Sequence, residues 1–202
     1  MILLTGFEPF GTHKVNPSEE IARALDGRRF GEHVVRGVVL PVHHREAAAQ
    51  MAALLQAIDP AAILHVGLAE GRARIALERV ALNVMDYAIA DNAGYRALDE
   101  ACVAGGPPAY FATLPLRDVL AALTADGVPA YISSTAGTYL CNQTLYATLH
   151  LVSCAGRTTR VGFVHLPLSA GMVAAAGVEL PSMDAPLMQR AIETVLRVVA
   201  AT

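Results

Sequence analysis

Short apolar runs typical of β-strands alternate with amphipathic helical patterns along the whole of this 202-residue chain. Extended segments are predicted at Ile2–Leu4, Val34–Val42, Ala62–Val66, Ile75–Val84, Ala130–Ser133 and Arg160–Val164. Helices are predicted from Pro17 to about Gly27 and at Arg45–Ile58, Leu116–Thr124, Cys141–Val152 and Ala185–Val199. Strands that alternate with helices pack as three α/β/α layers around a mostly parallel, twisted sheet. We therefore predict an α/β fold with a single domain over residues 1–202, for which a hydrophobic fraction of 54% supplies an ample core.

Local signals refine this outline. Asn16 can cap the first helix, Pro17 suits its first position, and Glu19 can close a capping box. Residues 86–108 contain glycines and prolines suited to a long loop excursion. The segment Ser169–Gly177 is rich in alanine and glycine, and we expect it to be either mobile or a contact between subunits.

The charge pattern gives no sign of a nucleic-acid or membrane partner. The net charge is −3, and the basic residues are scattered along the chain. Lys14 is the only lysine, so the chain has no Gly-Lys-Ser/Thr phosphate loop, and a catalytic lysine is not expected.

The three cysteines, Cys102, Cys141 and Cys154, form no CxxC pair, and their odd number argues against a disulfide framework. The chain contains no leader-like segment and no run of eighteen apolar residues, so we expect a soluble cytoplasmic protein. His43-His44 lacks the HExxH arrangement, and His150 and Cys154 have no further obvious ligands. No metal site is therefore expected from these residues.

Cys141 is the strongest candidate for a catalytic nucleophile, because small and turn-forming residues give way there to a helix start. Unpaired N–H groups and the helix dipole lower the pKa of a thiol at that place and can bind an oxyanion. His165 ends an apolar run and Glu78 interrupts another, which supplies a base and an orienting acid. The loops after Thr5, Gly67, Ser133 and His165 each follow a strand, and we expect them to converge on one edge of the sheet.

Each candidate also has a plain structural interpretation. Cys102 and Cys154 are expected to be small buried hydrophobic residues. His165 alone could be a hydrogen-bonded structural histidine. A carboxylate buried at Glu78 requires either an arginine or an imidazole partner.

Five blocks in chain order resemble the type I pyroglutamyl peptidases, also called pyrrolidone-carboxylate peptidases. They are Thr5-Gly-Phe-Glu-Pro-Phe-Gly11 with Asn16-Pro-Ser18, His65-Val-Gly-Leu-Ala-Glu-Gly-Arg72, Glu78-Arg-Val-Ala-Leu-Asn83 with Asp91-Asn92, Ser134 to Asn142, and Gly162-Phe-Val-His-Leu-Pro167. One block would be a weak signal, but five in order from Leu3 to the last helix are highly specific.

The resemblance implies a cysteine peptidase that removes an N-terminal pyroglutamyl residue from peptides through a thioester acyl-enzyme. In that interpretation Cys141 is the nucleophile, His165 is general base and then general acid, and Glu78 holds His165 in the required tautomer. It also implies a nucleoside-phosphorylase-like α/β/α fold, no metal or cofactor, a cytosolic location and a homotetramer.

A pyroglutamyl group is a neutral lactam, so its site needs apolar walls and a few backbone partners. The resemblance makes Phe7 and Phe10 the clamp on the ring and Asn16 the support of their loop. It makes the Leu68 backbone a lactam contact, and it makes Tyr139 and Leu140 pocket walls.

The chain departs from the family at Tyr87-Ala-Ile-Ala-Asp-Asn92, where the arginine credited with helping the oxyanion is replaced by Ala88. Loss of one such donor costs roughly 10²–10³ in rate. We expect another basic residue, Arg96 or Arg72, to reach the same space, with backbone N–H groups at Cys141 supplying the rest.

Two other functions stay open at this stage. A nucleoside- or nucleotide-processing enzyme is compatible with the architecture, although no phosphate cradle is evident. A catalytically weakened or inactive relative that binds pyroglutamyl peptides is compatible with Ala88, although all three triad candidates are present.

Overall fold

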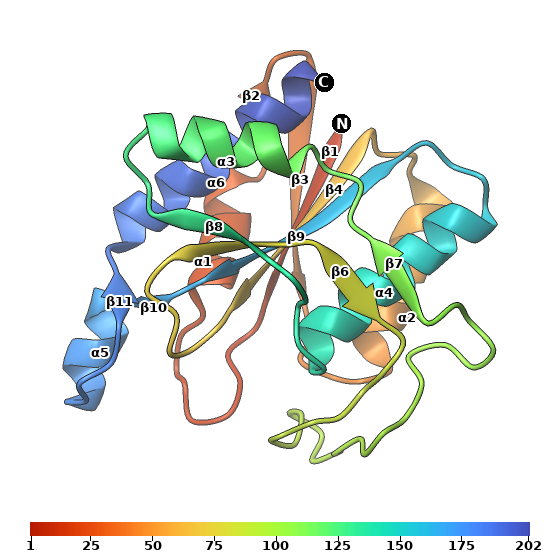
Figure 1. Ribbon diagram of the computed structural model, residues 1–202, viewed down its shortest axis with the longest axis horizontal. Coiled ribbons are helices and arrows are strands. Elements are labelled where there is room, and N and C mark those ends of the chain that lie inside the picture. Colours follow the sequence, from red (N-terminus) through yellow and green to blue (C-terminus); the bar gives the residue numbers. More distant parts are fainter.

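The structure, a computed structural model, describes residues 1–202 and confirms the α/β architecture (Figure 1). Its main sheet has seven strands in the order β2-β3-β1-β4-β9-β5-β8. These strands are β1 (Ile2–Phe7), β2 (Arg29–Phe30), β3 (His33–Leu40), β4 (Ala62–Leu68), β5 (Ile75–Glu78), β8 (Ala130–Ser133) and β9 (Arg160–Leu166). The six helices are α1 (Pro17–Leu25), α2 (Glu46–Ala57), α3 (Leu116–Ala125), α4 (Leu140–Cys154), α5 (Ala170–Ala176) and α6 (Ala185–Ala201).

The sheet is mixed, although parallel pairs predominate. Strands β3, β1, β4 and β9 run parallel to one another. At one edge β2 pairs with β3 antiparallel, and at the other β5 pairs with β9 antiparallel and with β8 parallel. The carboxyl ends of β1, β4 and β9 therefore share one edge, as predicted, and β8 points the other way. The expectation that the loop after Ser133 leaves from the same edge is wrong, and residues 134–139 instead lead the chain from β8 back to the start of α4.

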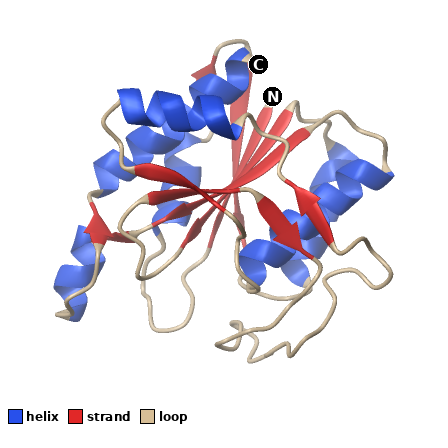
Figure 2. Cartoon of the chain, viewed as in Figure 1, coloured by secondary structure: helices blue, strands red, loops and turns tan.

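Both faces of the sheet are covered by helices, which Figure 2 shows as blue layers on either side of the red strands. Successive strand residues alternate between two apolar cores. In β1, Ile2 and Leu4 pack with residues of α1, α3 and α6, whereas Leu3 and Phe7 pack with residues of α2 and α4. The three-layer prediction is thus confirmed.

The predicted strand at Ile75–Val84 is divided in two. Residues Ile75–Glu78 belong to the main sheet, but β6 (Val80–Leu82) pairs with β7 (Ala109–Phe111) in a separate antiparallel ladder. Arg79 lies between them, exposed to solvent, and its N–H still bonds to Ser133. Apolar periodicity alone cannot show that a strand changes its pairing partner, so the sequence pattern predicted one strand where the structure has two.

At the start of α1 the Asn16 side chain accepts a hydrogen bond from the Ser18 N–H, and Pro17 occupies the first turn, as predicted. The capping box is wrong, because the Glu19 carboxylate pairs with Arg23 one turn along instead of returning to Asn16.

Two segments lie at the periphery. Residues 86–108 form the predicted long loop, closed by an isolated bridge between Met85 and Glu100. The segment after β9 forms β10 (Leu168–Ser169), α5 and then β11 (Ser182–Met183), which pairs with β10. Helix α5 buries none of its residues and projects from the body at the lower left of Figure 1. None of the helices has the length and apolarity needed to span a bilayer.

Candidate active site

Strand alternation brings the candidate catalytic residues to the face covered by α4. In β9, Val164 and Leu166 belong to the opposite core, so His165 points toward α4. In β5, Ile75 and Leu77 belong to that same opposite core, so Glu78 points toward α4 as well. Cys141 lies in the first turn of α4 itself. All three side chains therefore meet in one layer.

His165 and Glu78 are joined by a buried hydrogen bond. His165 Nδ1 lies 2.7 Å from Glu78 Oε1, and the two residues are 4% and 0% exposed. Burial would raise the pKa of the Glu78 carboxyl, but the bond to His165 and the nearby charges of His165 and Arg72 outweigh burial, and its pKa is lowered. An ionised carboxylate can only accept, so Nδ1 carries the proton and Nε2 is left to act as a base.

Burial also lowers the pKa of the His165 imidazole, and the hydrogen bond and charge of Glu78 oppose this only in part. The ring is therefore neutral at pH 7, which is the state that a general base requires.

Arg72 is a third member of this ion cluster. Its Nη1 donates to Glu78 Oε1 at 2.7 Å, so that one carboxylate oxygen serves both Arg72 and His165. The other oxygen, Oε2, is buried without a hydrogen-bond partner. Both structural interpretations of a buried Glu78, an arginine partner and an imidazole partner, hold at once.

Cys141 lies directly over the backbone of β4. A Cβ atom built on Gly67 would be only 3.1 Å from Cys141 Sγ, and Gly67 is the register partner of His165 in β9. Neighbouring strands are about 4.8 Å apart, so the thiol stands above the strand next to the one that carries the histidine.

The structure changes one expectation about this thiol. Burial, together with the charge of Glu78, raises the pKa of Cys141 to about 12, and the charge of Arg72 lowers it only in part. The helix start was expected to lower this pKa, but desolvation dominates. Cys141 is therefore a neutral thiol at pH 7 until a base removes its proton.

A small hollow opens beside Cys141, with a volume of about 30 Å³. Its walls include all six residues that sequence reasoning assigned to substrate binding, namely Phe7, Phe10, Asn16, Leu68, Tyr139 and Leu140. Val42, which sequence reasoning missed, completes the wall. Its mostly apolar walls suit a compact neutral group.

The loop that carries Phe10 is braced by hydrogen bonds. The Asn16 amide donates to the Glu8 carbonyl at 3.1 Å, which agrees with the supporting role expected for Asn16. Glu8 was missed, yet its carboxylate accepts from the Val42 N–H and from the Asn92 side chain. Val42 follows Glu8 by 34 positions in the chain, and Asn92 follows it by 84. No local sequence pattern could therefore reveal these two contacts.

The start of α4 is fixed by two polar residues that follow Cys141. The Asn142 amide exchanges hydrogen bonds with Leu82 and also donates to the Val84 carbonyl. Gln143 donates to the His44 carbonyl and accepts from the Tyr87 hydroxyl. Two amides on a buried helix face were a signal that sequence reasoning left unused, because buried amides require partners.

The two arginines expected to compensate for Ala88 lie in different places. Arg96 is exposed, and its Nε donates to the Tyr87 carbonyl, next to Ala88. Arg72 lies in the ion cluster with Glu78, and its charge acts on Cys141. Of the two, Arg72 is the one whose charge acts on the thiol.

The remaining histidine clusters brace the fold. Ligand atoms of His43, His44 and Asp91 lie within 4.8 Å of one another. However, the Asp91 oxygens already accept from His44 Nδ1 and from the N–H groups of His44, Ala93 and Tyr95. At the other cluster His150 contacts Tyr110 and Cys154, and Cys154 is exposed, contrary to the buried position expected for it.

The chain is similar to known proteins over most or all of its length. A family model described as pyroglutamyl peptidase matches residues 1–202. The pyrrolidone-carboxylate peptidase of Pyrococcus furiosus is 46% identical over 166 residues, which cover 82% of this chain and 80% of that protein. The pyrrolidone-carboxylate peptidase of Halalkalibacterium halodurans is 44% identical over 193 residues, or 95% of each chain. A solved structure of the Pyrococcus furiosus pyrrolidone carboxyl peptidase superposes with a TM-score of 0.96 at 40% identity and covers 99% of this chain and 98% of that one.

Proposed function

Because the chain belongs to the pyroglutamyl peptidase family and is itself a pyroglutamyl-peptidase, we propose that it removes N-terminal pyroglutamyl residues by cysteine catalysis with Cys141, His165 and Glu78. One observation carries the proposal. The Cys141 thiol lies against Gly67, which is the register partner of His165 on the neighbouring strand, and it lines a small apolar hollow. His165 is in turn hydrogen-bonded to the buried Glu78 carboxylate. The whole chain, residues 1–202, would act as one catalytic domain.

In the first half-reaction Cys141 Sγ attacks the carbonyl carbon of the pyroglutamyl residue, and the thiol proton passes to His165 Nε2. With a thiol pKa of about 12, proton removal and attack proceed together, and a standing thiolate is not required. The N–H groups in the first turn of α4 have no intrahelical partners and face the developing oxyanion. The C–N bond then breaks, and the His165 imidazolium returns its proton to the leaving amine.

In the second half-reaction water hydrolyses the thioester. His165 Nε2 takes a proton from the water, whose oxygen attacks the thioester carbonyl. The C–S bond breaks, pyroglutamic acid leaves, and the sulfur regains a proton from His165. Glu78 stabilises the imidazolium in both halves and keeps Nδ1 protonated.

The substrate assignment rests on the shape and polarity of the hollow. Phe7 and Phe10 would hold the lactam ring between apolar surfaces, with Tyr139 and Leu140 as further walls. The Leu68 backbone would meet the lactam amide. A free N-terminal ammonium finds no carboxylate among these walls, so an uncyclised residue would be rejected.

The remaining expectations complete the proposal. We propose peptides with N-terminal pyroglutamate as the substrates, with no metal, cofactor, nucleic-acid or membrane partner. A cytoplasmic location and a homotetrameric assembly are proposed from the resemblance to the family.

The decisive experiment compares parent, Cys141→Ala and Cys154→Ala proteins on a chromogenic L-pyroglutamyl amide, with an alanyl amide as the substrate control. We expect release only from the pyroglutamyl substrate and only by the parent and Cys154→Ala. A folded parent without activity under reducing conditions would favour the inactive binding-protein alternative. Activity that survives in Cys141→Ala would overturn the proposed nucleophile.

A further inference from the structure

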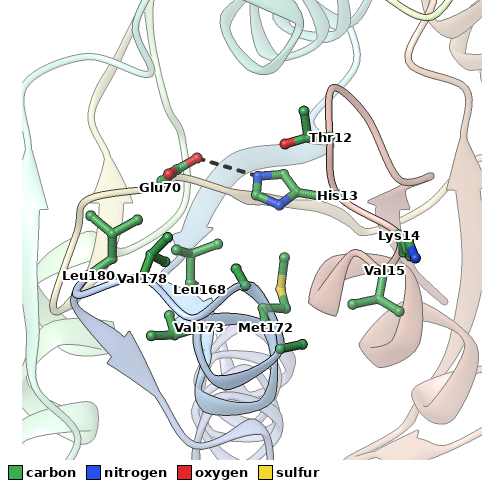
Figure 3. Close-up of a pocket in the computed structure, with 12 residues that line it drawn as sticks. Thr12, His13, Lys14, Val15, Glu70, Leu168, Met172, Val173, Val178 and Leu180 are labelled. Atoms are coloured by element: carbon green, nitrogen blue, oxygen red, sulfur yellow. Dashed lines mark ion pairs between the residues drawn. The ribbon is translucent and has the colours of Figure 1, made fainter.

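A groove of about 340 Å³ lies outside the hollow that holds Cys141 (Figure 3). One wall comes from the loop after β1, including His13 and Val15, and another from Glu70 in the loop after β4. The floor is formed by β10, α5 and the residues that follow it, which contribute Leu168, Met172, Val173, Ala175, Ala176, Val178 and Leu180.

The groove and the hollow have no lining residue in common, but their walls adjoin: Val15 of the groove precedes Asn16 of the hollow. The Phe10 ring lines the hollow and meets the His13 ring, which lines the groove, edge to face with centroids 5.7 Å apart. Leu68 of the hollow lies two residues before Glu70 of the groove. Along the next strand, Leu168 on the groove floor follows His165 by three residues. The groove therefore begins beside the hollow, at the strand ends that carry the site.

The direction of a substrate follows from its chemistry. A pyroglutamyl residue is cyclised at its nitrogen, so nothing precedes it in the peptide. The substrate can extend from the hollow only through the carbonyl carbon and the leaving amine. That amine receives its proton from His165, and the groove floor starts just after His165 in the chain.

The lining favours apolar side chains. Figure 3 shows Leu168, Met172, Val173, Val178 and Leu180 below the ion pair between His13 Nε2 and Glu70 Oε2, which are 3.4 Å apart. Val178 is 44% exposed and α5 buries none of its residues, so this apolar surface is open within one copy of the chain. Each methylene group buried there strengthens binding about fourfold.

We propose that this groove binds the peptide segment directly after the scissile bond and selects substrates with apolar side chains at the first two positions of the leaving peptide. This inference rests on the proposed function, since it extends the same site. It assigns α5, which begins five residues after His165, a role in specificity.

The test measures kcat/KM for three substrates. L-Pyroglutamyl amide, which releases ammonia, fills the hollow alone; pyroglutamyl-Leu-Leu amide and pyroglutamyl-Ser-Ser amide also reach the groove. We expect the parent to prefer the Leu-Leu peptide to the Ser-Ser peptide by tenfold or more. We expect Val173→Asp to reduce the Leu-Leu rate at least tenfold and to leave L-pyroglutamyl amide within twofold of the parent.

Val34→Asp is the matched control, because it places the same change on an exposed valine of β3. Val173→Ser replaces Val173→Asp if the aspartate variant does not fold. Equal effects on all three substrates, or none, would overturn the inference. A parent that cleaves the Leu-Leu and Ser-Ser peptides equally well would also overturn it. So would a Val173→Asp variant whose only change is dissociation into smaller species, because a second copy of the chain would then occupy the groove. Failure of the proposed function is distinct, since the parent would then be inactive on L-pyroglutamyl amide.

Discussion

Gly67 lies so close to Cys141 that a Cβ atom at position 67 would be 3.1 Å from the sulfur. The same atom would be 2.8 Å from the Phe163 ring, which in turn lies 4.6 Å from the His165 ring between centroids. The absence of a side chain at Gly67 thus lets Cys141 approach the strand beside the one that carries His165.

We predict that Gly67→Ala lowers kcat/KM on the chromogenic amide by about tenfold to a hundredfold, since displacements well below 1 Å misalign reacting groups. Gly171→Ala is the control, because the nearest neighbour of its added Cβ is 4.0 Å away. Steady-state kinetics together with circular dichroism checks both variants. Full turnover in a folded Gly67→Ala protein would show that the thiol does not depend on this contact.

The candidate site residues stand out in the sequence because each lies at an end of a local element or interrupts its pattern. Cys141 at a helix start, His165 at a strand end and Glu78 within an apolar run each stand out from their neighbours in the sequence. The order of strands and helices gave the three layers for the same reason, since periodicities of 2 and 3.6 residues are local properties.

What escaped prediction depends on long-range pairing. The reversal of β5 and β8 is set by partners far away in the chain, and so is the separation of β6 from β5. The raised pKa of Cys141 depends on how much protein covers the thiol, which the helix start alone does not disclose. Glu8 and Val42 join the site only through contacts of loops.

Glu78→Gln should lower kcat by about 10²–10⁴, because it removes the charge that stabilises the imidazolium and fixes its tautomer. Glu78 raises the pKa of His165, so its loss lowers that pKa further. The acidic limb of the profile of kcat/KM against pH should therefore move to lower pH. Glu193→Gln, which alters an ion-paired carboxylate on α6, should change neither value. An acidic limb that moves to higher pH would contradict the assignment.

We propose that Arg72, whose charge acts on Cys141, compensates for Ala88, so Arg72→Ala should lower kcat by about 10²–10³. Its charge lowers the pKa of His165, so the acidic limb should move to higher pH in this variant. Arg96→Ala should stay within about threefold of the parent, since its guanidinium is held on the Tyr87 carbonyl. The reverse order of effects would assign the role to Arg96, and full turnover in both variants would refute compensation by either arginine.

Thiol alkylation should distinguish the three cysteines. At pH 7 iodoacetamide should modify the exposed Cys154 first, because burial raises the pKa of Cys141 to about 12 and that of Cys102 to about 11. Mass spectrometry of peptides from a time course gives the order. Fastest labelling at Cys141 would mean that a thiolate stands ready in the resting enzyme, and the concerted proton transfer proposed above would be wrong.

His65 should make the protein sensitive to acid. The ring is buried in β4 between the hydroxyls of Thr5 and Thr148, and burial lowers its pKa from 6.5 to about 3. The unfolded chain therefore binds a proton before the folded one as the pH falls. This contribution to stability is fully present above pH 6.5 and is lost as the pH falls toward 3.

The loss amounts to about 1.4 kcal/mol for each pH unit within that window, from this histidine alone. We predict that urea unfolding at pH 4 to 7 gives a steeper fall in the free energy of unfolding for the parent than for His65→Gln. The variant should also be less stable at pH 7, because it cannot reproduce both hydrogen bonds to the two threonines. The test therefore compares the slope of the free energy of unfolding against pH, and not its value at pH 7. His33→Gln is the control, since His33 lies at the start of β3 and bonds to the N-terminal amine in an exposed contact. Parallel slopes for the parent and His65→Gln would mean that a proton reaches His65 in the folded protein.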